Sequence, residues 1–268
     1  MKLLIFGDVV AKIGRKTVAN VLPAWRELHQ PDLVLANVEN LAHGIGATTK
    51  TLQDLLDAGV DFFTSGNHIW GKKEIITTLN DPHGKVIRPA NYPEGTAGRG
   101  WQIIAAGNKT LLVINLLGKV FFKEGDTLDN PFRKLDAILY ELADKADAII
   151  VDMHAEATSE KIAMGWYADG RVSAVYGTHT HVPTADAHIL PEGTAYITDI
   201  GMTGLYRSSL GANIDFVIDK FLDQKSEHQM WDTPENGLAV VNAVLIDVDV
   251  KTKRAVAITR LFEKINLA

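Results

Sequence analysis

The sequence contains no cysteine among its 268 residues. This absence excludes disulfide bonds, thiolate metal sites and cysteine nucleophiles, and it fits a reducing compartment. No apolar run approaches the roughly 18 residues that a membrane-spanning helix needs. The apolar stretch from Leu3 to Phe6 ends at Gly7-Asp8 and is too short for the core of a signal peptide. We therefore expect a cytoplasmic protein that does not enter the membrane.

The chain also lacks an excess of basic residues. It has 27 Lys and Arg against 33 Asp and Glu, and its net charge is −6. Binding to a nucleic-acid backbone requires a clustered basic face, whereas these basic residues are scattered. We expect no stable nucleic-acid binding. A small anionic substrate remains compatible with this charge, because bound metal cations would supply local positive charge.

Strand and helix signals alternate along the first eighty residues. The apolar run at 3–6 is typical of a strand buried on both faces. The other predicted strands lie at 32–36, 62–64, 102–105, 111–116, 148–151, 173–176 and 195–198, with a closing hairpin at 238–248 and 255–261. The predicted helices lie at 15–28, from 48 or 49 to 56, at 73–79 and at 132–143, and Gly59 ends the second of them. Because we find no linker or repeat, we expect residues 1–268 to form one α/β domain with a mixed sheet or two stacked sheets.

Metal-ligating side chains follow several of these strands. They are Asp8, Glu39, Asn40, Asn67, His154, His179 and His181. Because residues just beyond the carboxyl ends of strands gather along one edge of an α/β sheet, we expect these side chains to converge. The set is larger than one cation needs. It suits two metal ions that share a bridging carboxylate, an arrangement that attacks phosphate esters.

Local spacing adds two expectations. His179 and His181 are two residues apart, so an extended backbone would point both imidazoles the same way. Glu39 and Asn40 are adjacent and cannot both face inward from a regular strand, so we expect them where the strand breaks into the loop at 44–46. Each segment alone also has a simpler interpretation, such as a turn, a helix cap or a surface loop, and the metal interpretation depends on the combination.

The segments Gly7-Asp8, Gly66-Asn67-His68 and Gly177 to His181 resemble those of the calcineurin-like binuclear metallophosphoesterases. Two departures are informative: the usual Asp-x-His opening is here Asp8-Val9-Val10, and the usual Gly-Asp of the second motif is here Glu39-Asn40. Both departures are similar to a bacterial branch, the YmdB-like phosphodiesterases, described as 2′,3′-cyclic-nucleotide 2′-phosphodiesterases. The segments at 14–15, 69–70, 152–156 and 198–204 also resemble that branch, so the likeness spans nearly the whole chain.

The resemblance implies a two-sheet αββα sandwich that holds two metal ions, with iron or manganese favoured and zinc compatible. By position, Glu39 would bridge the metals. Asp8, Asn40 and His181 would complete one metal's ligands, and Asn67, His154 and His179 the other's. A metal-bridged hydroxide would open the 2′ bond of a cyclic nucleotide to give a 3′-nucleotide, and other small phosphodiesters would be further substrates. The resemblance also implies a homo-oligomer.

His68 would stay unligated and donate a proton to the departing ribose oxygen; a supporting or phosphate-binding role is the alternative. The loops at 118–126 and 203–207 are candidates to shape the nucleotide pocket. Within the second loop, Arg207 either grips a phosphate or is solvated, and we favour solvation. We expect His43 on the surface.

Two other functions remain open. A phosphomonoesterase or nucleotidase would use the same scaffold. A regulatory protein that senses a nucleotide with little turnover is the third interpretation, but a sensor does not need a pair of metals that activates water.

Overall fold

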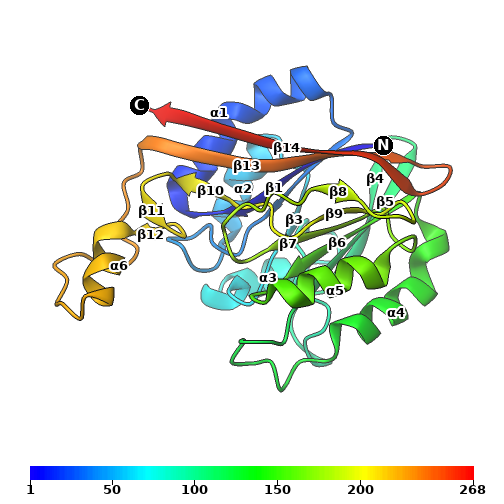
Figure 1. Ribbon diagram of the computed structural model, residues 1–268, viewed down its shortest axis with the longest axis horizontal. Coiled ribbons are helices and arrows are strands. Elements are labelled where there is room, and N and C mark those ends of the chain that lie inside the picture. Colours follow the sequence, from blue (N-terminus) through cyan, green and yellow to red (C-terminus); the bar gives the residue numbers. More distant parts are fainter.

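Two six-stranded sheets lie face to face, and helices cover both outer faces (Figure 1). This computed structural model describes residues 1–268, the whole chain. The order of layers is helix, sheet, sheet, helix, so the predicted αββα sandwich is confirmed. None of the helices combines the length and the apolar composition that a bilayer crossing requires.

The first sheet has the strand order β14-β13-β10-β1-β2-β3. Its strands are β1 (Lys2–Val9), β2 (Leu33–Asn37), β3 (Phe62–Thr64), β10 (Met202–Leu205), β13 (Gly237–Asp249) and β14 (Arg254–Leu267). The strand β1 pairs in parallel with β2 and β10, and β2 pairs in parallel with β3. Strand β13 runs antiparallel to β1, and β14 pairs with β13 at the edge of the sheet. The predicted closing hairpin is therefore confirmed.

The second sheet has the strand order β4-β5-β6-β7-β9-β8. Its strands are β4 (Trp101–Ala106), β5 (Lys109–Leu117), β6 (Ala148–His154), β7 (Ala174–Thr178), β8 (His188–Ile189) and β9 (Ala195–Ile197). The four central strands β5, β6, β7 and β9 are parallel. Two short strands, β11 (Ser208–Ser209) and β12 (Ala212–Asn213), pair outside both sheets.

The helices are α1 (Ala11–His29), α2 (Thr49–Asp57), α3 (Ile75–Asn80), α4 (Pro131–Leu142), α5 (Thr158–Ala168) and α6 (Ile214–Phe221), with 3₁₀ turns at Ile69–Gly71 and Ala143–Lys145. Helices α1, α2 and α3 pack on the first sheet, and α4 and α5 pack on the second. Of the two candidate starts at 48 and 49, the structure has Thr48 as the cap of α2, through a capping box with Thr51.

The alternation of side chains along β1 explains why its sequence is almost continuously apolar. Leu4 and Phe6 pack against the helices of the first sheet. Leu3 and Ile5 point the other way, into the core that both sheets share. Successive side chains of a strand alternate between its faces, and here both faces are covered. The core between the sheets holds the carboxyl ends of their parallel strands in fixed positions.

The sequence prediction omits helices α5 and α6, strand β10 and the two-residue strands β8, β11 and β12. Helix α5 buries Lys161 and Gly165, which interrupt its apolar period. Helix α6 buries none of its residues, so it has no core-facing stripe to detect. Strand β10 spans only 202–205 and falls within a segment assigned by family likeness alone. The expectation that Asp8 and His154 follow their strands is wrong, because β1 continues to Val9 and β6 continues to His154.

Candidate metal centre

The predicted ligands gather where the carboxyl ends of the parallel strands of both sheets meet. Asp8 lies near the end of β1, and Glu39 and Asn40 lie in the turn after β2. Asn67 follows β3, and His154 is the last residue of β6. His179 and His181 follow β7. Ends of neighbouring parallel strands share an edge of the sheet, so side chains separated by up to 173 positions in the sequence (from Asp8 to His181) become neighbours.

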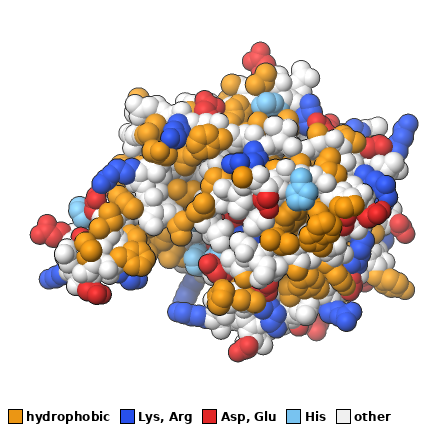
Figure 2. Space-filling view, in the orientation of Figure 1, with side chains coloured by type: hydrophobic (Ala, Val, Ile, Leu, Met, Phe, Trp, Pro, Cys, Tyr) orange, Lys and Arg blue, Asp and Glu red, His pale blue; other side chains and the backbone are white.

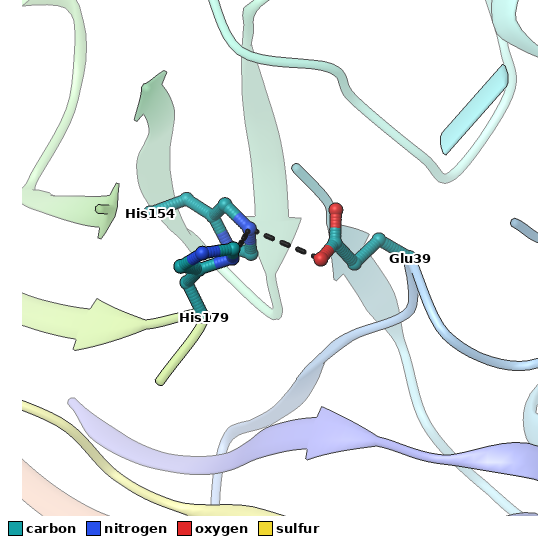
Figure 3. Close-up of side chains that lie close together, drawn as sticks. All are labelled: Glu39, His154 and His179. Carbon is teal, nitrogen blue, oxygen red and sulfur yellow. Dashed lines mark hydrogen bonds and ion pairs between the residues drawn. The ribbon is translucent and has the colours of Figure 1, made fainter. Parts of the chain in front are cut away.

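Glu39, His154 and His179 form the centre of the cluster and point toward one another from three different segments (Figure 3). Glu39 Oε1 lies 3.1 Å from His154 Nε2, and His154 Nε2 lies 3.1 Å from His179 Nδ1. Glu39 is 1 % exposed and His154 is fully buried. One carboxylate and two imidazoles within this distance are a ligand set suited to a transition metal.

Asp8 links the first strand to the histidine segment. Its Oδ2 accepts a hydrogen bond of 3.0 Å from the backbone N–H of His179, and its Oδ1 lies 3.7 Å from His181 Nε2. His181 Nδ1 lies 2.8 Å from the carbonyl oxygen of Leu210. A carbonyl can only accept, so Nδ1 carries a proton, and Nε2 is the nitrogen that faces Asp8 and could bind a metal.

Three buried oxygens at this centre have no hydrogen-bond partner. They are Oδ1 of Asp8, Oδ1 of Asn40 and Oδ1 of Asn67. Buried oxygens are almost always hydrogen-bonded, and an unsatisfied one is costly. All three belong to residues expected to bind metal. A cation satisfies such oxygens directly, so these residues fit metal ions better than they fit a metal-free polar network.

Gly66 shows how closely the chain approaches the centre. A Cβ atom at this position would lie 2.2 Å from His154 Nε2 and 2.3 Å from Glu39 Oε2. No side chain larger than hydrogen fits there. The glycine therefore lets the backbone before Asn67 pass beside Glu39 and His154, and it brings the Asn67 side chain to the same centre.

The charges at the centre are strongly coupled. Burial alone would raise the pKa of Glu39, but His154, His68 and His179 lower it to about 2. Burial alone would lower the pKa of His154, but Glu39, Asp8 and Asp152 raise it to about 9. Burial raises the pKa of Asp8. A proton on His154 thus balances the buried carboxylates, and a bound cation would displace that proton.

The pKa of His179 shifts in the opposite direction from that of His154. Burial, together with the positive charge on His154, lowers the pKa of His179 to about 3. Its imidazole is therefore neutral at physiological pH, the form that binds metals. The ring of Phe122 lies 4.9 Å from that of His179, between centroids. His179 Nε2 also lies 3.0 Å from Glu156 Oε2, at the solvent side of the cluster.

A buried network behind His154 was not recognised in the sequence as functional. His154 Nδ1 lies 2.8 Å from Thr178 Oγ1, and Thr178 donates a hydrogen bond of 2.6 Å to Asp152 Oδ1. Asn37 donates one of 3.1 Å to Asp152 Oδ2, and Thr64 also donates to that oxygen. Because the Thr178 hydroxyl donates its proton in the hydrogen bond to Asp152, it accepts a hydrogen bond from His154 Nδ1. This arrangement aims Nε2 at the centre.

Burial raises the pKa of Asp152 to about 6, even though it accepts several hydrogen bonds. One signal for this network is present in the sequence, because Asp152 and Thr178 belong to the segments 152–156 and 177–181 that resemble the family.

The backbone of the histidine segment differs from the expectation. His179 has φ of 92° and His181 has φ of 64°, so the chain is not extended there. The expectation that both imidazoles point the same way from an extended backbone is wrong. Each histidine instead reaches the cluster from a left-handed conformation, which costs free energy for a residue with a Cβ. The expectation for Glu39 and Asn40 holds, because both lie in the turn beyond β2 and both are buried.

His68 lies at the edge of the cluster. Its side chain is 39 % exposed, and its Nδ1 lies 3.6 Å from Glu39 Oε1. Its backbone N–H donates a hydrogen bond of 2.8 Å to Glu39 Oε2. Arg207 is exposed and pairs with Asp215 at 2.9 Å, in agreement with the favoured solvated interpretation. His43 is exposed, as expected.

Two adjoining hollows open over the cluster. A cavity of 230 Å³ is lined by Glu39, Asn40, His68, Glu156, His179, Thr180, His181, Leu210 and Trp231. A wider cleft of 680 Å³ is lined by Asn67, His68, Phe121, Phe122, Lys123, Glu124, Glu156 and His179. Part of the predicted loop 118–126 therefore does line a cleft beside the centre. Basic and acidic side chains are interspersed on the face shown in Figure 2.

Comparison with known proteins agrees with the family resemblance seen in the sequence. A family model described as YmdB-like protein matches residues 4–261. A protein of Bacillus subtilis named 2′,3′-cyclic-nucleotide 2′-phosphodiesterase is 46 % identical over 97 % of this chain and 96 % of its own length. The crystal structure of a phosphatase from Mycoplasma pneumoniae superimposes with a TM-score of 0.89 and 36 % identity, over 99 % of this chain and 94 % of that one.

A more distant structure shows the fold alone. The NAD nucleotidase of Haemophilus influenzae aligns with a TM-score of 0.62 and 13 % identity, over 100 % of this chain and 56 % of that one. The resemblance predicted from the sequence is therefore confirmed, in fold and in branch. The chain belongs to the YmdB-like family, on the calcineurin-like metallophosphoesterase fold.

Proposed function

We propose that this protein is a metal-dependent phosphodiesterase that hydrolyses 2′,3′-cyclic nucleotides to 3′-nucleotides and accepts other small phosphodiesters. The observation that carries the proposal is the convergence of unpartnered buried oxygens with the Glu39, His154 and His179 triad. The relative in Bacillus subtilis, whose name gives this activity, matches 97 % of the chain at 46 % identity and supports the substrate class.

We assign the residues to two adjoining cation sites. Asp8, Asn40 and His181 would hold one cation, Asn67, His154 and His179 the other, and Glu39 would contact both. The short separations of Asp8 from His181 and of Glu39 from His154 support this division. When bound, such a pair supplies a water of lowered pKa and neutralises charge on the phosphate oxygens. Nitrogen and oxygen ligands together favour iron, manganese or zinc over magnesium or calcium, and we propose iron or manganese.

The chain itself orients these groups and handles the proton of the leaving group. The Asp152 and Thr178 network fixes the tautomer of His154. His68 projects from the rim into the cavity above Glu39. As the 2′ oxygen leaves phosphorus, an imidazolium at His68 would donate the proton that the departing alkoxide needs. The phosphate then stays on the 3′ oxygen.

Replacing His68 by alanine tests this role. We expect turnover to fall about 100-fold, the lower end for a general acid, because a side chain that is 39 % exposed can be replaced in part by water. Metal content measured by elemental analysis should stay normal. His83→Ala, at an exposed histidine outside the site, is the control. A metal-free His68→Ala protein would instead make His68 a ligand.

The decisive experiment combines elemental analysis of the purified protein with identification of the product from 2′,3′-cyclic AMP. We expect two metal ions per chain and 3′-AMP as the product. Hydrolysis of only a monoester substrate would favour the nucleotidase interpretation. Nucleotide binding without turnover by the metal-loaded protein would favour the sensor interpretation.

Three further properties concern the location, the domain organisation and the assembly of the enzyme. We propose that it acts in the cytoplasm, that its 268 residues work as a single domain and that it assembles as a homo-oligomer. Size-exclusion chromatography with light scattering tests the assembly.

A further inference from the structure

The wider cleft beside the metal centre carries features that the hydrolysis of a phosphate ester does not need. It shares His68, Glu156 and His179 with the cavity over Glu39, so the two spaces adjoin. Its volume of 680 Å³ lies within the range of about 300–1,000 Å³ that is usual for small-molecule sites. A phosphate held at the metal centre therefore leaves room for the rest of a substrate in this cleft.

Hydrogen bonds anchor the start of the loop that forms one wall of the cleft. It connects β5 with α4 and projects at the lower edge of Figure 1. Glu160 on α5 accepts hydrogen bonds from the backbone N–H groups of Lys119 (2.9 Å) and Val120 (3.1 Å). Lys119 Nζ donates to the carbonyl of Leu128 at 2.7 Å. These bonds close the loop on itself and on the helix, so its next residues have a defined position.

Two phenylalanines follow this anchored segment. Phe121 is 84 % exposed and has φ of 69°. A bulky side chain in the left-handed region is strained, and an exposed aromatic ring is poorly hydrated. Phe122 is half-buried, and its ring packs on that of His179. The loop therefore presents an exposed flat ring directly before Phe122, whose own ring lies against a candidate metal ligand.

The charges along the cleft favour an uncharged occupant. Glu124 and Glu156 both line it, and apart from the histidines of the metal centre, His68 and His179, Lys123 is the one basic residue among the lining side chains. A second phosphate would meet two carboxylates against one ammonium. A neutral flat ring meets no such repulsion, and its faces can stack on an aromatic side chain. A nucleobase attached to a single cyclic phosphate has these properties.

Trp231 is the competing aromatic residue, because it lines the smaller cavity. Its ring already covers the backbone of Gly44, where an added Cβ atom would lie 2.1 Å from Trp231 Cε3. One face of the indole is therefore occupied within the protein. Phe121, by contrast, has most of its surface free.

We propose that Phe121 is the stacking platform for the nucleobase of the substrate, supported by Phe122 against His179. The inference rests on the proposed function and adds to it a subsite for the base. Stacking uses the face of the ring and not its hydrogen-bonding edge, so the subsite accepts every base and holds purines more tightly than pyrimidines. It would give a nucleotide a lower KM than the other small phosphodiesters that the centre accepts.

The test compares two substrates that differ only in the base. 2′,3′-Cyclic AMP carries adenine, and 1-O-methylribose 2,3-cyclic phosphate carries none. For Phe121→Ala, we expect the KM for cyclic AMP to rise about tenfold while kcat stays within about twofold. The kinetics on the baseless ester should not change. Phe121→Trp should restore the KM. Phe221→Ala is the matched control, because Phe221 is also 84 % exposed but lies on α6.

The outcomes separate this inference from the proposed function. Equal KM values of the wild type for the two esters, or an unchanged KM in Phe121→Ala, would overturn the platform and leave the hydrolysis intact. A KM increase in Trp231→Ala without one in Phe121→Ala would move the subsite to Trp231. If the wild type hydrolyses neither ester, the proposed function fails. The dissociation constant of 3′-AMP, measured by calorimetry, then still tests the platform: a tenfold increase in Phe121→Ala supports it, and an equal value overturns it.

Discussion

Glu39→Gln is expected to lower both the metal affinity and the turnover of the protein more than about 100-fold. Removing a group that only supports a ligand typically costs about 10- to 100-fold, so removing a ligand that faces two cation sites should cost more. Glu39 is 1 % exposed and lies 3.1 Å from His154 Nε2. Glutamine keeps the size of the side chain but removes its charge, and a neutral amide cannot balance the cations that the centre would hold.

The metal content of Glu39→Gln is measured by elemental analysis after dialysis against a buffered metal solution. Its turnover of 2′,3′-cyclic AMP is measured in parallel. Glu156→Gln is the matched control. Its carboxylate also contacts a histidine of the cluster, at 3.0 Å from His179 Nε2, but its side chain is 49 % exposed. Solvent screens that contact, so we expect less than about a tenfold effect. Normal metal content in Glu39→Gln would show that Glu39 only supports the fold of the turn after β2.

The positions of the candidate ligands could be predicted because they follow from strand topology. Buried parallel strands are visible as apolar runs, and the residues that end them must share an edge. Asn67 and His154 were found in this way, from a sequence in which they are 87 positions apart (67 to 154). Glycine at position 66 is explained only by the structure, where Glu39 and His154 leave no room for a Cβ atom.

The support behind the ligands could not be predicted by the same argument. Thr178 and Asp152 are ordinary strand residues in the sequence, and their role depends on which strands become neighbours. The left-handed backbone at His179 and His181 is equally invisible to periodicity, since it is imposed by contacts with Asp8, Leu210 and Asp199. Helix α5 could not be predicted either, because its buried Lys161 interrupts the apolar periodicity that indicates a helix.

The buried pair of Lys161 and Asp199 holds the histidine segment in that backbone conformation. Lys161 Nζ lies 2.7 Å from Asp199 Oδ2, and both side chains are fully buried. The same carboxylate accepts hydrogen bonds from the backbone N–H (3.2 Å) and the hydroxyl (2.6 Å) of Thr180, which stands between the two histidines. Lys161 also donates to the Thr180 hydroxyl at 3.2 Å. A helix on the outer face of the second sheet thus reaches the metal centre through one ion pair.

Lys161→Met is therefore expected to destabilise the protein by about 3–5 kcal/mol, because it leaves Asp199 as an uncompensated buried charge. The midpoint of urea unfolding measures the loss. Lys12→Met removes a surface pair with Glu235, whose side chains are 50 % and 56 % exposed, and should cost less than about 1 kcal/mol.

The double variant Lys161→Met with Asp199→Asn should recover part of the stability, since no charge is then left buried. Its metal affinity should stay below that of the wild type, because a neutral amide at position 199 anchors Thr180 and the histidine segment more weakly. An unfolding midpoint of Lys161→Met equal to that of the wild type would show that the pair contributes nothing net. Recovered stability together with normal metal affinity in the double variant would show that the histidine segment keeps its shape without the ion pair.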